Sequence, residues 1–186
     1  MYEYFLYDGA SHSSIASFGP DIFERTIVVN ACSKSHSMTG LRIGYAAGPR
    51  SIMKLVDGLQ GQVTSGASSV AQYMAIAALK SSKNDFAEIV SQFRKKRDFA
   101  LSLLEDVGLA AIAPKGAFYI FLPIMHLGVG SEEFCRRLID EEKVAAVPGV
   151  AFGREGYVRI SYATSEENLA EGIRRMGALA GRIKAD

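Results

Sequence analysis

The 186-residue sequence contains no tryptophan, only two cysteines, and nearly equal numbers of basic and acidic residues, 21 against 20. Two cysteines are too few for a disulfide framework, and the spacing of Cys32 and Cys135 matches no metal-binding signature. The formal net charge of +1 excludes the strong field that attracts nucleic acid or anionic lipid. No apolar run approaches the roughly 18 residues that span a bilayer, and no secretory signal opens the chain. These absences predict a cytoplasmic globular protein with no bound metal and no nucleic-acid or membrane partner.

Hydrophobic patterning indicates a mixed fold of the α/β or α+β class, without internal repeats. Apolar and alternating runs predict strands at residues 26–30, 43–47, 117–122 and 157–162. Helical spacing predicts a helical region over 49–80 that breaks at 60–69, a long helix over 82–107, and two helices capped by Ser131 and Thr164. The first strand is apolar and β-branched, which is typical of a strand buried on both faces.

The most informative stretch is Ser33-Lys-Ser-His-Ser-Met-Thr-Gly-Leu-Arg-Ile-Gly-Tyr45. Lys34 follows the first strand, and ligands of open α/β sheets gather at the carboxyl ends of strands. Arg42 precedes the next strand, so an antiparallel return would place it at the same edge as Lys34. An amine can form an imine with a carbonyl, and a guanidinium can grip a phosphate. Pyridoxal 5′-phosphate has both groups, although a solvated turn lysine is the alternative that spacing alone leaves open.

This segment resembles the cofactor-lysine signature of the fold-type I aminotransferases of class I/II. The Ser-Lys-x-His-x-Met-Thr-Gly form is similar to the aspartate, aromatic and N-acetyl-diaminopimelate branch. Five further segments resemble that family in the same order: 1–3, 7–9, 114–119, 147–153 and 157–162. The resemblance implies the C-terminal part of the large-domain sheet over residues 1–85, and an α+β small domain with its connecting helix over 86–186. It also implies a homodimer for the full-length enzyme.

The resemblance assigns cofactor roles to three residues. Lys34 would hold pyridoxal 5′-phosphate as an imine and then move a proton between the substrate and the cofactor. Arg42 would bind the cofactor phosphate, and Tyr2 would donate a hydrogen bond to the ring hydroxyl. Met38 and Thr39 resemble packing residues of the loop.

Arg159 is the expected substrate-binding residue. In an alternating strand it shares one face with Tyr157 and Ser161, whereas Val158 and Ile160 point to the other. A strand arginine is ordinarily a solvent-facing residue, but in this family pattern Arg159 would bind the substrate carboxylate through paired hydrogen bonds. Amino acid and 2-oxo acid substrates, which both bear that carboxylate, are therefore implied. Tyr119 is predicted either to line the pocket or to be an ordinary core aromatic.

Other polar residues have simpler interpretations. His12, His36 and His126 lack partners at ligand or triad spacing and are predicted to be loop residues. The basic run Arg94–Arg97 is predicted to form the solvated face of the long helix. Cys32 is expected to be a packed thiol rather than a nucleophile.

The sequence departs from the family pattern at its amino end. Ala31 stands where the family has Ser or Gly, and the Asp expected three residues before Tyr2 lies outside the sequence. That Asp keeps the pyridinium nitrogen protonated, which makes the ring an electron sink. The sequence therefore resembles the C-terminal half of an aminotransferase, and we expect this chain to be inactive alone.

Three alternatives stay open at this point. A carbon–sulfur β-lyase would use the same lysine and carboxylate-binding arginine, although the Met-Thr-Gly-Leu-Arg form favours transamination. The effector domain of an aminotransferase-like transcriptional regulator would require a helix-turn-helix domain upstream. A remnant that acts only through protein contacts is the third alternative, and retention of Lys34, Arg42 and Arg159 argues mildly against it. The amino acid substrate is not specified by these residues.

Overall fold

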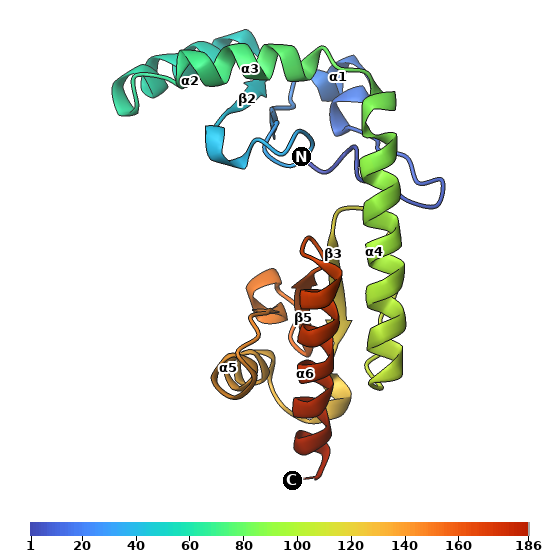
Figure 1. The fold of residues 1–186 in the computed structure, drawn as a ribbon. Helices are drawn as coiled ribbons and strands as arrows, with labels where there is room; N and C mark the ends of the chain where they lie inside the picture. Colours follow the sequence, from blue (N-terminus) through green and yellow to red (C-terminus); the bar gives the residue numbers. More distant parts are fainter. Residues whose placement is uncertain (186) are drawn as a thin grey trace. The chain divides into compact units, whose positions relative to one another are not determined.

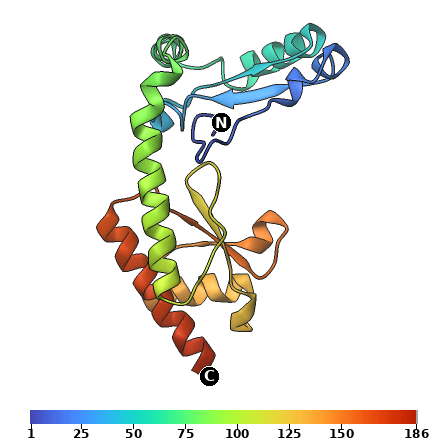
Figure 2. The same ribbon diagram turned by 90° about the vertical axis from the view of Figure 1, so that its right-hand side faces the viewer.

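The computed structural model describes residues 1–185, apart from the side chains of residues 83 and 84. The chain forms two compact units, unit 1 over residues 1–88 and unit 2 from residue 89 onward. Each unit contains its own small antiparallel sheet and its own helices (Figures 1 and 2). Over the described range, no helix is both long and apolar enough to cross a membrane.

Unit 1 is built around a two-stranded antiparallel sheet. Strands β1 (Val28–Ala31) and β2 (Gly44–Ala47) pair from Val28 with Ala47 to Ala31 with Gly44. The helices are α1 (Pro20–Phe23), α2 (Arg50–Val63) and α3 (Ser69–Leu79), with short 3-10 turns η1 (Ile15–Ser17), η2 (Thr39–Leu41) and η3 (Lys83–Phe86). The break predicted at 60–69 therefore separates α2 from α3.

The prediction that the first strand is buried on both faces is wrong. Val29 is 76% exposed, and the remaining residues of β1 are only half-buried. The described sheet of unit 1 has two strands, and all four residues of β2 are exposed, so the surrounding structure does not enclose the sheet on both faces. An apolar, β-branched run reports strand propensity but not how many layers cover the strand.

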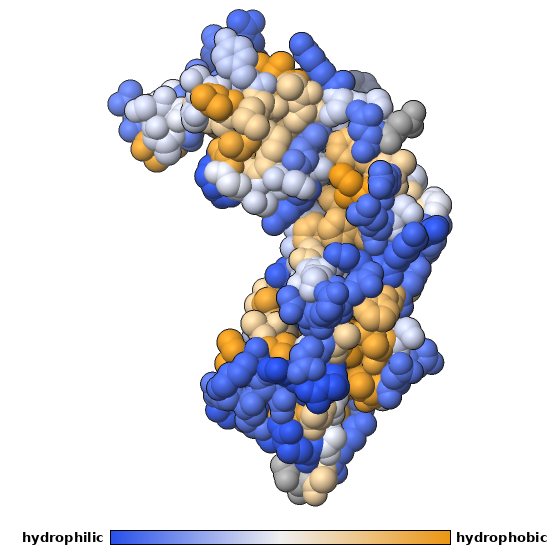
Figure 3. Space-filling model, viewed as in Figure 1, coloured by the Kyte–Doolittle hydropathy of each residue, from blue (hydrophilic) through white to orange (hydrophobic). Residues whose placement is uncertain are grey.

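The small core of unit 1 lies between α3 and the segment after β1. Cys32, Met38 and Ala75 are buried together, and the partly buried Leu41 and Ile43 pack against them. The other apolar side chains of α2 and α3 are widely exposed, as in Leu55 and Tyr73, each 75% exposed. Figure 3 shows apolar side chains gathered on the surface over these two helices. The core thus supports the Lys34 segment directly, while most of the helical surface stays uncovered.

Unit 2 contains a three-stranded antiparallel sheet in the order β3-β5-β4. The strands are β3 (Tyr119–Pro123), β4 (Val147–Pro148) and β5 (Tyr157–Ser161), and β4 was not predicted because it has only two residues. The helices are α4 (Ala87–Asp106), which begins at the boundary between the units, α5 (Ser131–Glu142) and α6 (Glu166–Ala185), with 3-10 turns η4 (Met125–Leu127) and η5 (Gly149–Phe152). The predicted strands and helices are therefore confirmed, with small shifts at their ends.

The two faces of the unit 2 sheet differ in burial. Ile120, Leu122 and Val158 are fully buried on the face that α4 and α6 help to cover, and the buried Ile160 lies with them. The opposite face bears half-buried residues, including Phe121 paired with Arg159. Alternation along β5 therefore places Arg159 on the more open face, as the sequence pattern predicts.

The prediction that Arg94–Arg97 is a solvated face is wrong for its last two residues. Arg97 is only 4% exposed and donates a hydrogen bond of 3.0 Å to the carbonyl of Pro114. Lys96 Nζ donates to the carbonyl of Thr164 at 2.5 Å. These two cations anchor the segments before β3 and after β5, because a charged donor can satisfy a backbone carbonyl that the strands leave unpaired.

Both predicted helix caps differ in detail. Ser131 is the first residue of α5 rather than its cap, and its backbone N–H and hydroxyl both donate to the Glu155 carboxylate at 2.5 and 2.8 Å. These bonds, with one from the Gly156 backbone, lower the pKa of Glu155. Ser165 takes the place predicted for Thr164, since its hydroxyl accepts the Asn168 N–H at 3.2 Å.

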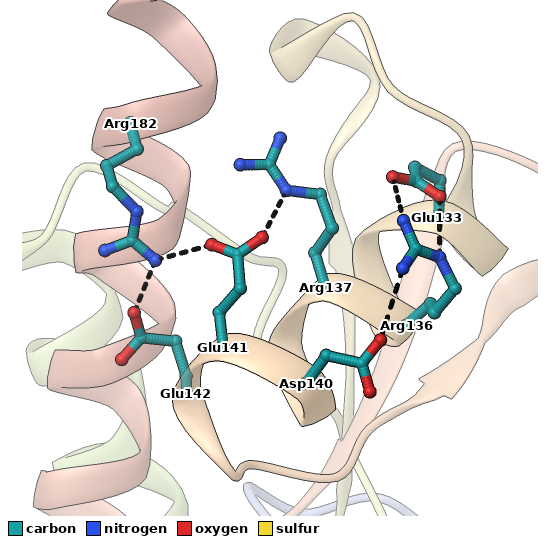
Figure 4. A network of polar contacts seen from close by, with 7 residues as sticks. All are labelled: Glu133, Arg136, Arg137, Asp140, Glu141, Glu142 and Arg182. Atoms are coloured by element: carbon teal, nitrogen blue, oxygen red, sulfur yellow. Dashed lines mark hydrogen bonds and ion pairs between the residues drawn. The ribbon is translucent and has the colours of Figure 1, made fainter.

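Ion pairs join α5 to α6 (Figure 4). Arg182 of α6 contacts the carboxylates of Glu141 and Glu142 at 2.9 and 2.5 Å. Arg175 adds a hydrogen bond of 2.9 Å to the carbonyl of Glu142. The network therefore binds the end of α5 to α6, the helix that also packs against the sheet.

Candidate functional site

Lys34 lies in a turn directly after β1. The turn is closed by a hydrogen bond of 3.1 Å from the His36 N–H to the Cys32 carbonyl. The Lys34 side chain is half-buried, whereas Cys32 before it and Met38 after it are buried in the core. Two buried side chains therefore fix the ends of the segment that presents the amine. Burial also raises the pKa of the Cys32 thiol, as expected for a packing residue.

His36 fixes the middle of this segment. Its Nδ1 shares a hydrogen bond of 2.8 Å with the hydroxyl of the buried Ser35, and its Nε2 lies 3.4 Å from the hydroxyl of Ser81. The imidazole meets the ring of Phe86 edge-on with 4.9 Å between centroids, and Tyr4 stacks on the same phenyl ring at 4.4 Å. His36 is thus a loop residue, as predicted, and it also anchors the turn that bears Lys34.

Arg42 lies at the same end of the sheet of unit 1 as Lys34. Ala31 and Gly44 form the last residue pair at this end of the sheet. Lys34 follows the end of β1 and Arg42 precedes the start of β2, so both residues lie beyond the same end. Arg42 adopts a left-handed backbone conformation with φ of 50°, and its Nη1 donates to the Thr39 carbonyl at 2.8 Å. Its side chain is otherwise exposed. Because β2 runs antiparallel to β1, the residues that bear an amine and a guanidinium lie at one end of the sheet.

The amino-terminal segment lies beside β1. Tyr2 is half-buried, and the carboxylate of the next residue, Glu3, accepts a hydrogen bond of 2.8 Å from the Asn30 amide. Asn30 is paired with Tyr45 across the sheet. Burial is the main cause that raises the pKa of Tyr45, and the negative charge of Glu3 adds to it. Tyr2 is thereby held near the strand that leads to Lys34.

Arg159 of unit 2 occupies an aromatic setting. Its guanidinium carbon lies 4.4 Å from the centroid of the Tyr119 ring and 4.5 Å from that of Phe152. Within residues 1–185, no carboxylate pairs with Arg159 and no hydrogen bond reaches its guanidinium. A half-buried guanidinium without an internal anion can form paired hydrogen bonds with an external anionic group.

A pocket of about 530 Å³ opens beside this guanidinium. Its wall combines Arg159 with the aromatic and aliphatic side chains of Tyr119, Phe121, Phe152, Tyr157 and Ile112, together with Ala113 and Pro114. A mostly apolar wall with one cation suits a small molecule with a carboxylate and a carbon body. Of the two alternatives predicted for Tyr119, the structure places it in the pocket wall.

Sequence reasoning missed the contribution of Phe152 and of Glu155. Phe152 belongs to the segment 147–153, but nothing in its spacing from Arg159 indicates that the two touch. Glu155 looks like an ordinary turn residue until the structure shows it bound to Ser131. No group of three or more potential metal ligands occurs in the part of the chain that the structure describes.

The fold and the segment from Ser33 to Tyr45 are those of fold-type I pyridoxal phosphate enzymes. Residues 1–176 match the family described as aminotransferase class I and II, and the chain belongs to this family. Members of that family use pyridoxal phosphate as their cofactor.

Individual relatives agree with this family. The chain is 41% identical to the probable aspartate/prephenate aminotransferase of Rickettsia bellii over 98% of this chain and 49% of that protein. It is 42% identical to aromatic-amino-acid aminotransferase 2 of Thermococcus litoralis, over 95% of this chain and 46% of that protein. The crystal structure of the aromatic aminotransferase from Pyrococcus horikoshii superposes with a TM-score of 0.91 at 41% identity, covering all of this chain and 50% of that one. The chain therefore spans about half the length of the relatives it matches.

Proposed function

We propose that this chain belongs to a pyridoxal 5′-phosphate-dependent aminotransferase, which moves an amino group between an amino acid and a 2-oxo acid. The proposal rests on the placement of Lys34 and Arg42 at one end of the β1–β2 sheet. The names of the relatives, aspartate/prephenate and aromatic aminotransferases, favour acidic or aromatic amino acids as substrates. The activity proposed is that of the full-length enzyme.

The residues of unit 1 suit the cofactor chemically. The Lys34 amine can bond covalently to an aldehyde, and the exposed guanidinium of Arg42 can form charge-assisted hydrogen bonds to a phosphate. The Tyr2 phenol can donate a hydrogen bond to the ring hydroxyl. When bound, the cofactor supplies the electron sink for the reaction. The chain supplies position, through the anchored turn, and a proton acceptor, through the Lys34 amine.

Arg159 of unit 2 would bind the substrate carboxylate. Its guanidinium has no ion-pair partner within residues 1–185, so a carboxylate can occupy its donors without displacing an internal anion. Both amino acid and 2-oxo acid substrates carry that carboxylate. We assign unit 1 to the large domain and unit 2 to the small domain on the same family resemblance.

Borohydride trapping tests the cofactor site. The purified chain is incubated with pyridoxal 5′-phosphate, reduced, and digested for peptide mass mapping. We expect selective modification of Lys34, because the turn holds it at the sheet edge. Lys54, an exposed lysine of α2, is the internal control. Equal labelling of Lys34 and Lys54 would contradict a cofactor site in this chain.

A comparison of two aldehydes tests the role of Arg42. Pyridoxal lacks the phosphate of pyridoxal 5′-phosphate but has the same aldehyde. Loss of a charge-assisted hydrogen bond costs about 1.5–3 kcal/mol. Arg42→Ala should therefore weaken binding of pyridoxal 5′-phosphate by roughly tenfold or more. Binding of pyridoxal should not change, and Arg42→Lys should recover part of the loss. Equally weakened binding of both aldehydes would show that Arg42 supports the fold and does not bind the phosphate.

We also propose a cytoplasmic location and a homodimeric full-length enzyme, as the family resemblance implies. Both cysteines are free thiols, which suits a reducing compartment. The exposed apolar side chains of α2 and α3 provide surface that a further polypeptide could cover.

A further inference from the structure

Two aromatic rings contact the guanidinium of Arg159 from different elements. Tyr119 comes from β3, diagonally across the sheet from Arg159, and Phe152 comes from η5. Both ring centroids lie within 4.5 Å of the guanidinium carbon, well inside the range of cation–π attraction. Arg159 therefore contacts two rings that different elements of unit 2 supply.

This arrangement determines which part of Arg159 stays available. The N–H donors of a guanidinium lie in its plane, whereas aromatic rings attract it through its faces. A ring that attracts a guanidinium through its face leaves the edge available, and that edge is where paired hydrogen bonds to a carboxylate form. Arg159 also lines the 530 Å³ pocket, so the open edge has space for a ligand.

The rings themselves are held in place. Phe152 meets Phe121 edge-on with 6.2 Å between centroids, and Phe121 stacks on Tyr157 at 4.9 Å. Tyr119 packs against Phe118, whose ring stacks on Phe93 of α4 at 5.4 Å. Each ring that touches Arg159 is thus supported by a second ring, which limits its motion.

We propose that Tyr119 and Phe152 are positioning residues, which hold the Arg159 guanidinium with its edge toward the ligand carboxylate. The proposal rests on the proposed role of Arg159 as the carboxylate-binding residue. A free arginine side chain loses rotamer freedom when it binds, and a side chain already held in its binding conformation avoids most of that loss. The aromatic pair therefore increases carboxylate affinity without touching the carboxylate.

Nuclear magnetic resonance of the full chain tests the contact itself. Arg159→Lys identifies the Nε–H signal of Arg159 by its disappearance. Because the rings shield nuclei above their faces, we expect this signal to lie upfield of those of exposed arginines such as Arg50. Tyr119→Leu and Phe152→Leu should each move it downfield, whereas Tyr119→Phe should not. A signal that stays in place in both leucine variants would overturn the proposal.

Binding of 2-oxoglutarate, measured by titration of the same samples, tests the consequence. Loss of one cation–π contact should raise the dissociation constant about two- to fivefold in Tyr119→Leu and in Phe152→Leu. Tyr119→Phe keeps the ring and should bind as the unmodified chain does. Equal weakening in Tyr119→Phe and Tyr119→Leu would assign the effect to the hydroxyl and overturn the proposal.

The two measurements separate failure of this proposal from failure of the proposed function. Unchanged binding in Arg159→Lys would refute the carboxylate-binding role of Arg159, and the positioning role with it. Lost binding in Arg159→Lys, together with unchanged binding in both leucine variants, would refute the positioning role alone. Dispersed amide spectra in every variant provide the control that the chain remains folded.

Discussion

The Tyr162→Phe substitution probes what holds the segment that leads into β3. Tyr162 is fully buried, and its hydroxyl donates a hydrogen bond of 2.9 Å to the Ala117 carbonyl. Ala117 has a φ of 59°, in the left-handed region that costs a non-glycine residue about 1–2 kcal/mol. The hydrogen bond therefore supports a backbone conformation that the residue itself disfavours, two positions before Tyr119.

The expected loss follows from the geometry. Tyr162→Phe removes one oxygen and leaves the ring, so no large cavity forms in the core. A hydrogen bond of this kind contributes about 0.5–1.5 kcal/mol net. We therefore expect the unfolding free energy of unit 2 to fall by roughly 1 kcal/mol.

Native-state amide exchange measures this loss within unit 2. The chain has no tryptophan to report unfolding by fluorescence, and exchange of the β3 and β5 amides reads the local free energy. Tyr73→Phe is the matched control, because Tyr73 is 75% exposed and its hydroxyl faces solvent. Equal protection of β3 and β5 in the two variants would refute the reasoning and show that the hydroxyl of Tyr162 does not hold this segment.

Three further predictions concern unit 2. Gly149→Ala should lower the unfolding free energy, measured by urea denaturation, by about 3 kcal/mol or more. The reason is that the added Cβ would lie 2.5 Å from the Tyr157 carbonyl oxygen. A variant of normal stability would contradict this. Hydrogen bonds from two neighbouring arginines lower the pKa of Glu171 from its ordinary 4.5 to about 2. The ionised carboxylate therefore stabilises the folded state above pH 4.5, and this stabilisation is lost as the pH falls toward 2. Glu171→Gln should remove that part of the pH dependence of unfolding, and an unchanged profile would count against it. Arg182→Ala should destabilise unit 2 slightly at low salt and less at 1 M salt, where the screening length falls to about 3 Å. A loss independent of salt would contradict the ion-pair origin.

Sequence reasoning was most successful where the determinants are local. Helical spacing predicted α4, α5 and α6, and period-two alternation placed Arg159 on the open face of β5. The Ser33–Tyr45 segment is continuous, so its resemblance to the aminotransferases could be read without a structure, and the family match agrees with it. The prediction that β1 is buried on both faces failed because burial depends on which layers cover a strand, and an apolar run does not specify those layers.

The sequence by itself determined the main elements and the family, and it predicted the residues proposed to bear the chemistry. The tertiary structure alone decided the environment of individual residues: His36 near the Ser81 hydroxyl, Arg97 buried against the Pro114 carbonyl, and Arg159 in contact with two rings. The physical reason is that each of these contacts joins residues whose approach depends on how the whole unit packs. Propensity and spacing act along the chain, whereas packing brings distant segments together and decides which polar groups face water and which face one another.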